Sequence, residues 1–137
     1  SIKAERTLQA MTRIRLRIDF DGERYIGHGR IELLELIGRH GSISKAAQAM
    51  NMSYKRAWYL IDGFNGMFRE PLIERHHGGR GGGSATLTPF GERVVAEYRA
   101  MEAKALEVFA GPVGLLEEKL VKSPEARRKS REGAPRA

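Results

Sequence analysis

Basic side chains gather at the start of one predicted helix and in a glycine-rich loop beyond it. Lys55 and Arg56 follow Ser53 and Tyr54, and Arg80 stands within the run GGRGGG. Lysine and arginine donate hydrogen bonds to guanine O6 and N7, and both pair with phosphates. Two cations at a helix N-terminus oppose the helix dipole, so an anion placed there would be favourable. These residues therefore predict a helix that enters a DNA major groove and a loop that reaches the backbone or minor groove beside it.

The predicted DNA-binding set extends this group to the start of the preceding helix and one turn along the basic helix. Tyr59 is placed outward on the helical wheel, whereas Trp58 falls at the edge of the buried face. For Trp58, packing against the preceding helix and contact with a thymine methyl group both remain open. The predicted DNA-binding residues are Ser44, Lys45, Ser53, Tyr54, Lys55, Arg56, Tyr59 and Arg80.

The net charge of +7 is distributed unevenly along the 137 residues. From Lys119 to the end there are seven basic and two acidic residues, so the tail accounts for most of the excess. Two roles stay open for this tail: added DNA affinity through counterion release, or a solubilising disordered end. The overall charge is therefore weaker support for DNA binding than the local cluster is.

Several other classes of protein are excluded or disfavoured by composition. The chain has no cysteine, which excludes a disulfide framework and a thiolate zinc site. It has no apolar run of about 18 residues and no signal-peptide pattern, so we expect a cytoplasmic protein without membrane contact. No carboxylate or third histidine sits at ligand spacing from the adjacent His76 and His77, and His28 and His40 are isolated, which disfavours a metal site. Gly83-Ser84 lacks the lysine of a phosphate-binding P-loop. We predict no catalytic residues, no metal, no cofactor and no enzymatic activity.

Hydrophobic periodicity predicts the elements that position the basic cluster. Residues 12–20 alternate apolar and charged side chains, which indicates a half-buried strand, and an Asp-Gly turn then leads to a short strand over residues 23–26. Residues 29–40 carry apolar side chains at helical spacing, and Gly41 predicts the end of that helix. Either Ser42 or Ser44 caps the short helix that follows.

The basic helix itself begins at Ser53, a residue type that caps helices, and Pro71 is predicted to end it. Residues 72–75 and 85–88 are predicted to pair as the two strands of a hairpin. The inward face of the basic helix is predicted to be Ala57, Ile61, Phe64 and Phe68.

A long helix over residues 89–110 follows, opened by Thr88 as cap and Pro89 as first residue. Its apolar side chains recur at spacings of three and four, close to the seam of a short coiled coil. We expect residues 122–137 to be disordered. The predicted dimerisation residues are Val94, Tyr98, Met101, Ala105 and Val108.

Three segments in fixed order carry a family resemblance. They read GSISKAAQAMNMSYKRAWYLIDGFN, PLIER and GGRGGGSATLTPFGERVV. Together they resemble the N-terminal DNA-binding domain of ModE-type molybdate-responsive transcriptional regulators, over roughly residues 12–110. More loosely they resemble LysR-type regulators, which share the Ser-x-Ser-x-Ala-Ala start and the Pro-Leu-x-Glu-Arg strand. The resemblance implies a winged helix-turn-helix, a long helix that forms a dimer, and operator binding.

ModE-type regulators usually carry C-terminal oxyanion-binding domains, and 27 residues follow Ala110 here. The sequence therefore predicts no such domain in this chain, which is either a single-domain relative or a fragment. The expected organisation is an N-terminal hairpin segment (1–28), a winged helix-turn-helix domain (29–88), a dimerisation helix (89–110) and a basic tail (111–137).

The sequence as a whole predicts a mainly α protein with small β-hairpins. We expect a homodimeric transcriptional regulator that binds a near-palindromic duplex and is linked to molybdenum metabolism, with its small-molecule effector unidentified. Two alternatives stay open: a small oxyanion sensor for molybdate or tungstate, and a winged-helix module that binds a protein through Trp58 and Tyr59.

Overall fold

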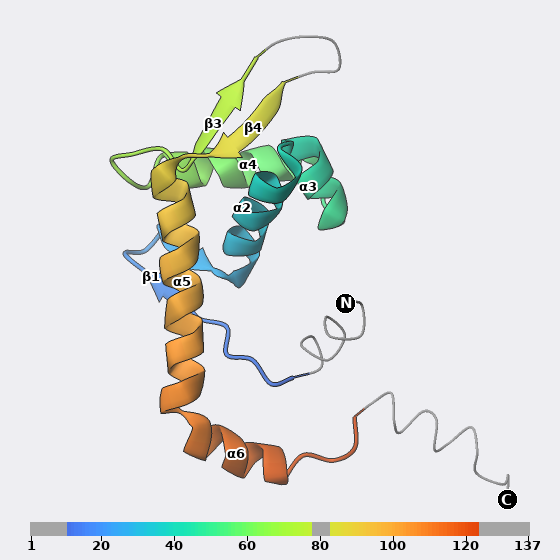
Figure 1. Cartoon of the computed structure of the whole chain (residues 1–137), viewed down its shortest axis with the longest axis vertical. Helices are drawn as coiled ribbons and strands as arrows, with labels where there is room; N and C mark the ends of the chain where they lie inside the picture. The colour runs from blue at the N-terminus through green and yellow to red at the C-terminus, as the bar shows by residue number, and fades with distance from the viewer. Residues whose placement is uncertain (1–10, 78–82, 124–137) are drawn as a thin grey trace, which may run out of the picture. The chain divides into compact units, whose positions relative to one another are not determined.

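The computed structural model describes residues 11–77 and 83–123 of the chain (Figure 1). The chain divides into two compact units, Ser1–Ala103 and Lys104–Ala137. Helices dominate, and two antiparallel hairpins accompany them, which confirms the predicted mainly α winged helix-turn-helix. The order of elements is β1 (Arg17–Asp19), β2 (Tyr25–Gly27), α2 (His28–His40), α3 (Ile43–Ala49), α4 (Tyr54–Asn65), β3 (Ile73–His76), β4 (Ser84–Leu87), α5 (Pro89–Val108) and α6 (Ala110–Glu118).

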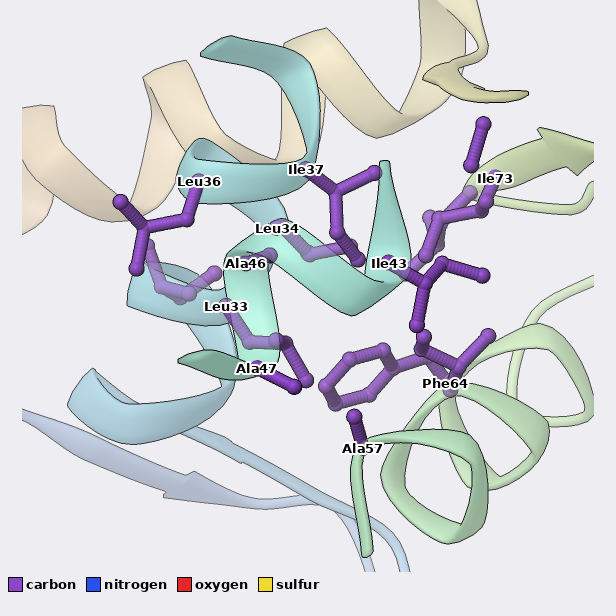
Figure 2. Packing of buried hydrophobic residues seen from close by; sticks show 14 of the residues in the cluster. Leu33, Leu34, Leu36, Ile37, Ile43, Ala46, Ala47, Ala57, Phe64 and Ile73 are labelled. Carbon is purple, nitrogen blue, oxygen red and sulfur yellow. The ribbon is translucent and has the colours of Figure 1, made fainter. Parts of the chain in front are cut away.

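Helix α2 supplies the centre of the hydrophobic core (Figure 2). It ends where Gly41 adopts a left-handed conformation, with φ of 66°, and its N–H donates to the carbonyl of Ile37 at 2.8 Å. Glycine adopts this conformation without strain, which confirms Gly41 as the stop. The apolar side chains of α2 pack against α3, α4 and the β3–β4 hairpin. The buried residues of α2 are Ile31, Leu33, Leu34, Leu36 and Ile37.

Serine hydroxyls cap both helices of the helix-turn-helix. Ser42 accepts from the backbone N–H of Lys45 at 3.2 Å, so the cap of α3 is Ser42 and not Ser44. Ser53 accepts from the N–H of Arg56 at 3.0 Å, which confirms it as the cap of α4. Asn51 lies in the turn between the two helices with a φ of 54°, a conformation that asparagine tolerates better than most residues.

Helix α4 ends at Asn65, earlier than Pro71, so the predicted end is wrong. The reason is the Asn65 side chain, whose oxygen accepts from the backbone N–H of Leu72 at 3.0 Å and of Ile73 at 3.3 Å. These bonds turn the chain back into β3 before the helix reaches the proline. Phe68 therefore lies beyond α4, half-buried, and its ring packs edge-on against Phe90.

The β3–β4 hairpin, the wing of the fold, pairs Ile73 with Leu87 and His76 with Ser84. The N–H of Ala85 donates to the carbonyl of Gly41 at 3.0 Å, so the wing is tied directly to the end of α2. Each strand end is shifted by one residue from the predicted ranges 72–75 and 85–88.

The N-terminal hairpin is shorter than its alternating pattern suggests. Only residues 17–19 of the predicted strand 12–20 pair, with β2. The turn that joins them is held by Asp21, whose carboxylate accepts from the backbone N–H groups of Arg24 and Glu23. These bonds lower the pKa of Asp21 to about 2.

Helix α5 begins as predicted, with the Thr88 hydroxyl accepting from the N–H of Gly91 at 2.9 Å. It ends at Val108, close to the predicted residue 110. A further helix, α6, follows and lies, apart from Ala110, within residues 111–137, for which the sequence predicts only a basic tail. Gly111 and Pro112 lie in the first turn of α6, where proline's missing N–H has no intrahelical partner to lose.

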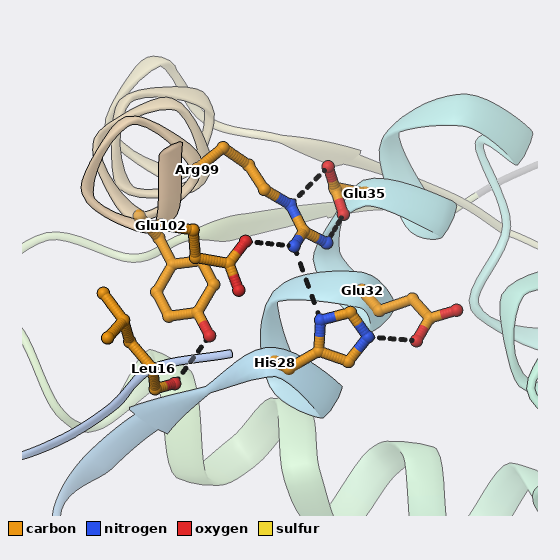
Figure 3. A network of polar contacts seen from close by, with 7 residues as sticks. Leu16, His28, Glu32, Glu35, Arg99 and Glu102 are labelled. Atoms are coloured by element: carbon orange, nitrogen blue, oxygen red, sulfur yellow. Dashed lines mark hydrogen bonds and ion pairs between the residues drawn. The ribbon is translucent and has the colours of Figure 1, made fainter. Parts of the chain in front are cut away.

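A polar network joins α5 to α2 (Figure 3). The guanidinium of Arg99 donates two hydrogen bonds to Glu35, at 2.5 and 3.2 Å, and one to Glu102 at 2.6 Å. These carboxylates, Glu35 first, raise the pKa of Arg99. Burial, and then the charges of Arg15 and Arg99, lower the pKa of His28. Its Nδ1 lies 3.4 Å from the Arg99 guanidinium, and its Nε2 lies 3.3 Å from the Glu32 carboxylate.

The start of α5 is also fixed by close backbone packing. A Cβ atom at Gly91 would collide with the carbonyl oxygen of Leu72. The Thr88 hydroxyl donates to the carbonyl of Pro71 at 2.7 Å, and the Thr88 N–H donates to Leu72 at 3.0 Å. The chain entering the wing and the helix leaving it are therefore held together at this point.

We expect Gly91→Ala to destabilise the fold by about 1–3 kcal/mol, because the added methyl group collides with the backbone carbonyl of Leu72 and must separate the two segments. Gly63→Ala is the matched control, since a Cβ at Gly63 meets nothing within 4 Å. On the exposed side of α4 this change should stabilise the helix by about 0.5–1 kcal/mol. Urea unfolding of the two variants measures both effects, and equal midpoints would contradict the junction argument.

Candidate nucleic-acid interface

The first turn of α4 presents its polar residues away from the core. Ala57, Ile61 and Phe64 are buried, as predicted for the inward face, and they fix the rotation of the helix about its axis. Lys55 and Arg56 are consequently exposed, and neither forms an ion pair with any residue that the structure describes. The helix therefore offers two free cations at its N-terminus, where an anion is favoured.

Two aromatic residues extend this exposed surface of α4. Tyr59 is 72% exposed, in agreement with its outward position on the helical wheel, and Tyr54 is 49% exposed. Exposure of the apolar area of large aromatic side chains to water is unfavourable. A surface that covers them in the bound state would remove this disadvantage.

The start of α3 lies beside the start of α4. Ser44 and Lys45 are both exposed, and Ser44 and Tyr54 line the same hollow. Ser53 is exposed as well, but its hydroxyl is already engaged as the cap of α4. The structure thus places six of the eight predicted DNA-binding residues at the starts of α3 and α4, and Tyr59 one turn further along α4. The eighth, Arg80, lies outside the described residues.

Trp58 is half-buried and packs against the core, in agreement with the first of the two alternatives that the sequence leaves open. Its ring carries the guanidinium of Arg75 at 4.0 Å from the ring centroid and meets the ring of Tyr54 edge-on at 6.1 Å. Arg75 was not among the predicted site residues. Its position next to the glycine loop was visible in the sequence, but its stacking on Trp58 depends on the wing folding back over α4.

The two wing histidines show no sign of a metal site. The Nε2 atom of His76 lies 3.1 Å from the Thr86 hydroxyl, a cross-strand contact, and His77 is exposed. No group of three potential metal-binding side chains occurs among the residues in the described ranges. Within the same ranges, no helix is long and apolar enough to cross a membrane.

The five predicted dimerisation residues do not share one exposed surface. Tyr98 is completely buried within its own chain, and its hydroxyl donates to the carbonyl of Leu16 at 2.6 Å. Its burial also raises its pKa. Val94 packs against the same core, and Ala105 is half-buried. Met101 and Val108 remain available, being 39% and 60% exposed. Tyr98 is therefore a core residue of its own chain and is not accessible to a second copy.

Comparison with known proteins identifies the domain that carries this surface. Residues 29–92 match the family described as bacterial regulatory helix-turn-helix proteins, lysR family. The chain is 48% identical over 88 residues to the molybdenum transport protein ModE of Azotobacter vinelandii, covering 64% of this chain and 33% of that protein. It is 41% identical over 102 residues to the molybdenum-pterin-binding protein MopA of Rhodobacter capsulatus, covering 72% and 38% respectively.

A third relative is named for DNA binding. The DNA-binding transcriptional dual regulator ModE of Escherichia coli (strain K12) is 40% identical over 84 residues, covering 59% of this chain and 32% of that protein. The chain spans about a third of the length of these relatives. The matched family is one of regulators and not of enzymes, as the sequence predicts. The family match and these relatives together support a DNA-binding helix-turn-helix domain of the ModE type over residues 29–92.

Proposed function

We propose that this protein is a cytoplasmic, sequence-specific transcriptional regulator that binds double-stranded DNA as a homodimer and serves molybdenum metabolism. One observation carries the proposal: the exposed, unpaired cations Lys55 and Arg56 at the start of α4, in a helix-turn-helix domain of the ModE type. The link to molybdenum comes from the names of the relatives.

In this proposal α4 is the recognition helix. Its N-terminal residues enter the major groove, α3 crosses the backbone beside it, and the wing lies over the adjacent phosphates. A two-fold dimer would present two copies of α4 to successive grooves about 34 Å apart, so the operator is a near-palindrome. The exposed residues Met101 and Val108 of α5 are the proposed contacts between the two copies.

The protein-binding alternative is weakened by the surroundings of Trp58. A protein-docking surface would need Trp58 and Tyr59 to be exposed together, as aromatic anchors usually are. Trp58 is instead half-buried and covered by the Arg75 guanidinium, so of these two residues only Tyr59 is exposed. An exposed tyrosine beside two free cations suits a polyanion better than an apolar protein partner.

Selection of bound sequences from a random duplex pool tests the proposal directly. We expect a near-palindromic consensus with half-sites one helical turn, or a multiple of it, apart. Recovery of unrelated sequences, or failure to retain any duplex at low salt, would contradict a sequence-specific role.

Replacing Lys55 and Arg56 together by alanine should weaken binding to the selected duplex and flatten its salt dependence. Each lost phosphate contact should lower the slope of log K against log salt by about 0.9. The matched control is Arg93→Ala with Lys104→Ala, which removes the same charge from exposed positions of α5. Fluorescence anisotropy over a salt series measures both variants. If the two double variants lose equal affinity, net charge and not α4 accounts for binding.

Single charged substitutions test the dimer. Met101→Glu and Val108→Glu should each shift the protein towards monomer in sedimentation equilibrium, because a glutamate in an apolar contact loses its hydration. Val94 is unsuitable for this purpose, since it packs against the core of its own chain. Circular dichroism should show unchanged helix content, and a dimer that survives both substitutions would place the interface elsewhere.

A further inference from the structure

We propose that a cavity between the start of α4 and the wing holds one phosphate of the DNA backbone, with Arg75 as its principal ligand. The proposal rests on the proposed DNA-binding function and adds a specific contact to it. The cavity has a volume of about 330 Å³. Its lining residues are Ser42, Ile43, Ser44, Tyr54, Arg75, Gly83, Ser84 and Ala85.

The chemistry of the lining suits an anion. Arg75 provides a guanidinium, and Ser44, Tyr54 and Ser84 provide hydroxyl groups that can donate hydrogen bonds. The lining contains no carboxylate that would repel or compete with a phosphate. Arg75 forms no ion pair with any residue in the described part of the chain, so its charge is not already neutralised.

Stacking on Trp58 orients the Arg75 guanidinium for binding a phosphate. The guanidinium lies over the indole ring at 4.0 Å, which favours one orientation of a side chain that would otherwise sample many. Stacking occupies the face of the guanidinium and leaves its N–H groups at the edge free for two parallel bonds to phosphate oxygens. Tyr54 packs edge-on against the same indole, so Trp58 supports two of the four donor residues.

Backbone bonds hold the two sides of the cavity together. Arg75 faces Ala85 across the wing, and the N–H of Ala85 donates to Gly41, immediately before Ser42. The donors on the wing and those on the helix starts therefore have a fixed separation before DNA arrives. A preorganised site of this kind loses less entropy on binding.

The position of the cavity favours a backbone phosphate over a free anion. Tyr54 belongs both to the cavity and to the exposed first turn of α4, whereas Arg75 and Ser84 belong to the wing. A DNA strand that runs from a groove occupied by α4 toward the wing would pass over this opening. All three polar residues are exposed, so a phosphate still attached to its strand can reach them.

The test uses the full chain and a duplex obtained from the random pool. Arg75→Ala should weaken binding about tenfold, the loss expected for one charge-assisted contact. It should lower the salt slope by about 1 and leave the sequence preference unchanged. Arg75→Lys should restore the slope but only part of the affinity, because lysine cannot form two parallel bonds.

Trp58→Phe should retain most of the affinity, since a ring still lies beneath Arg75. Arg93→Ala is the matched control, and thermal unfolding verifies that each variant is folded.

Single methylphosphonate substitutions along the duplex locate the contact. One neutralised phosphate in each half-site should weaken the original protein and should not weaken Arg75→Ala any further. An unchanged salt slope in Arg75→Ala, or additive losses at every phosphate, would overturn the proposal while leaving DNA binding itself intact.

Calorimetry with inorganic phosphate distinguishes a free anion from a strand. We expect no saturable heat at millimolar concentration, and saturable binding that Arg75→Ala removes would assign the cavity to a free oxyanion and overturn the proposal. If the original protein binds no duplex at low salt, both the proposed DNA-binding function and the phosphate contact are contradicted.

Discussion

Burial of the apolar face of α2 is the constraint on which the rest of the domain depends. Leu33, Leu34 and Ile37 are completely buried, and each such side chain contributes roughly 1.5–3 kcal/mol relative to exposure. Because α3, α4 and the wing all pack against this one helix, their directions are set by its surface (Figure 2). The cations of α4 are exposed because the opposite, apolar face of the helix is buried in this core.

Side-chain hydrogen bonds at two junctions fix the wing relative to α4 and α5. Asn65 ends α4 and starts the wing through its side-chain amide, and Thr88 ends the wing and starts α5 through its hydroxyl. Buried polar groups are costly unless they are bonded, so each junction holds only in its fully paired form. The wing consequently has both of its ends fixed to the core.

Local signals made much of this structure predictable, and long-range contacts explain what was missed. Gly41 and Ser53 act on neighbouring backbone, so their roles as helix stop and helix cap follow from the sequence alone. The end of α4 depends on Asn65 bonding residues seven and eight positions away. The stacking of Arg75 on Trp58 needs the wing to be folded first. Tyr98 fits a coiled-coil spacing equally well whether a second chain or its own N-terminal segment covers it, and periodicity cannot distinguish these partners.

The structure divides the arginines into two groups that composition cannot separate. Arg99 is neutralised by Glu35 and Glu102, and Arg30 stacks on Tyr25 while donating to its carbonyl at 3.1 Å. The charge of Arg99 is therefore neutralised within the protein, and the guanidinium of Arg30 is engaged by the ring and the carbonyl of Tyr25. Lys55, Arg56 and Arg75 have no such carboxylate partners among the described residues. Only cations left unpaired by folding can release counterions from DNA. The capacity to bind a polyanion therefore depends on which charges the fold leaves unneutralised, and the cations at the start of α4 and on the adjoining strand of the wing are among them.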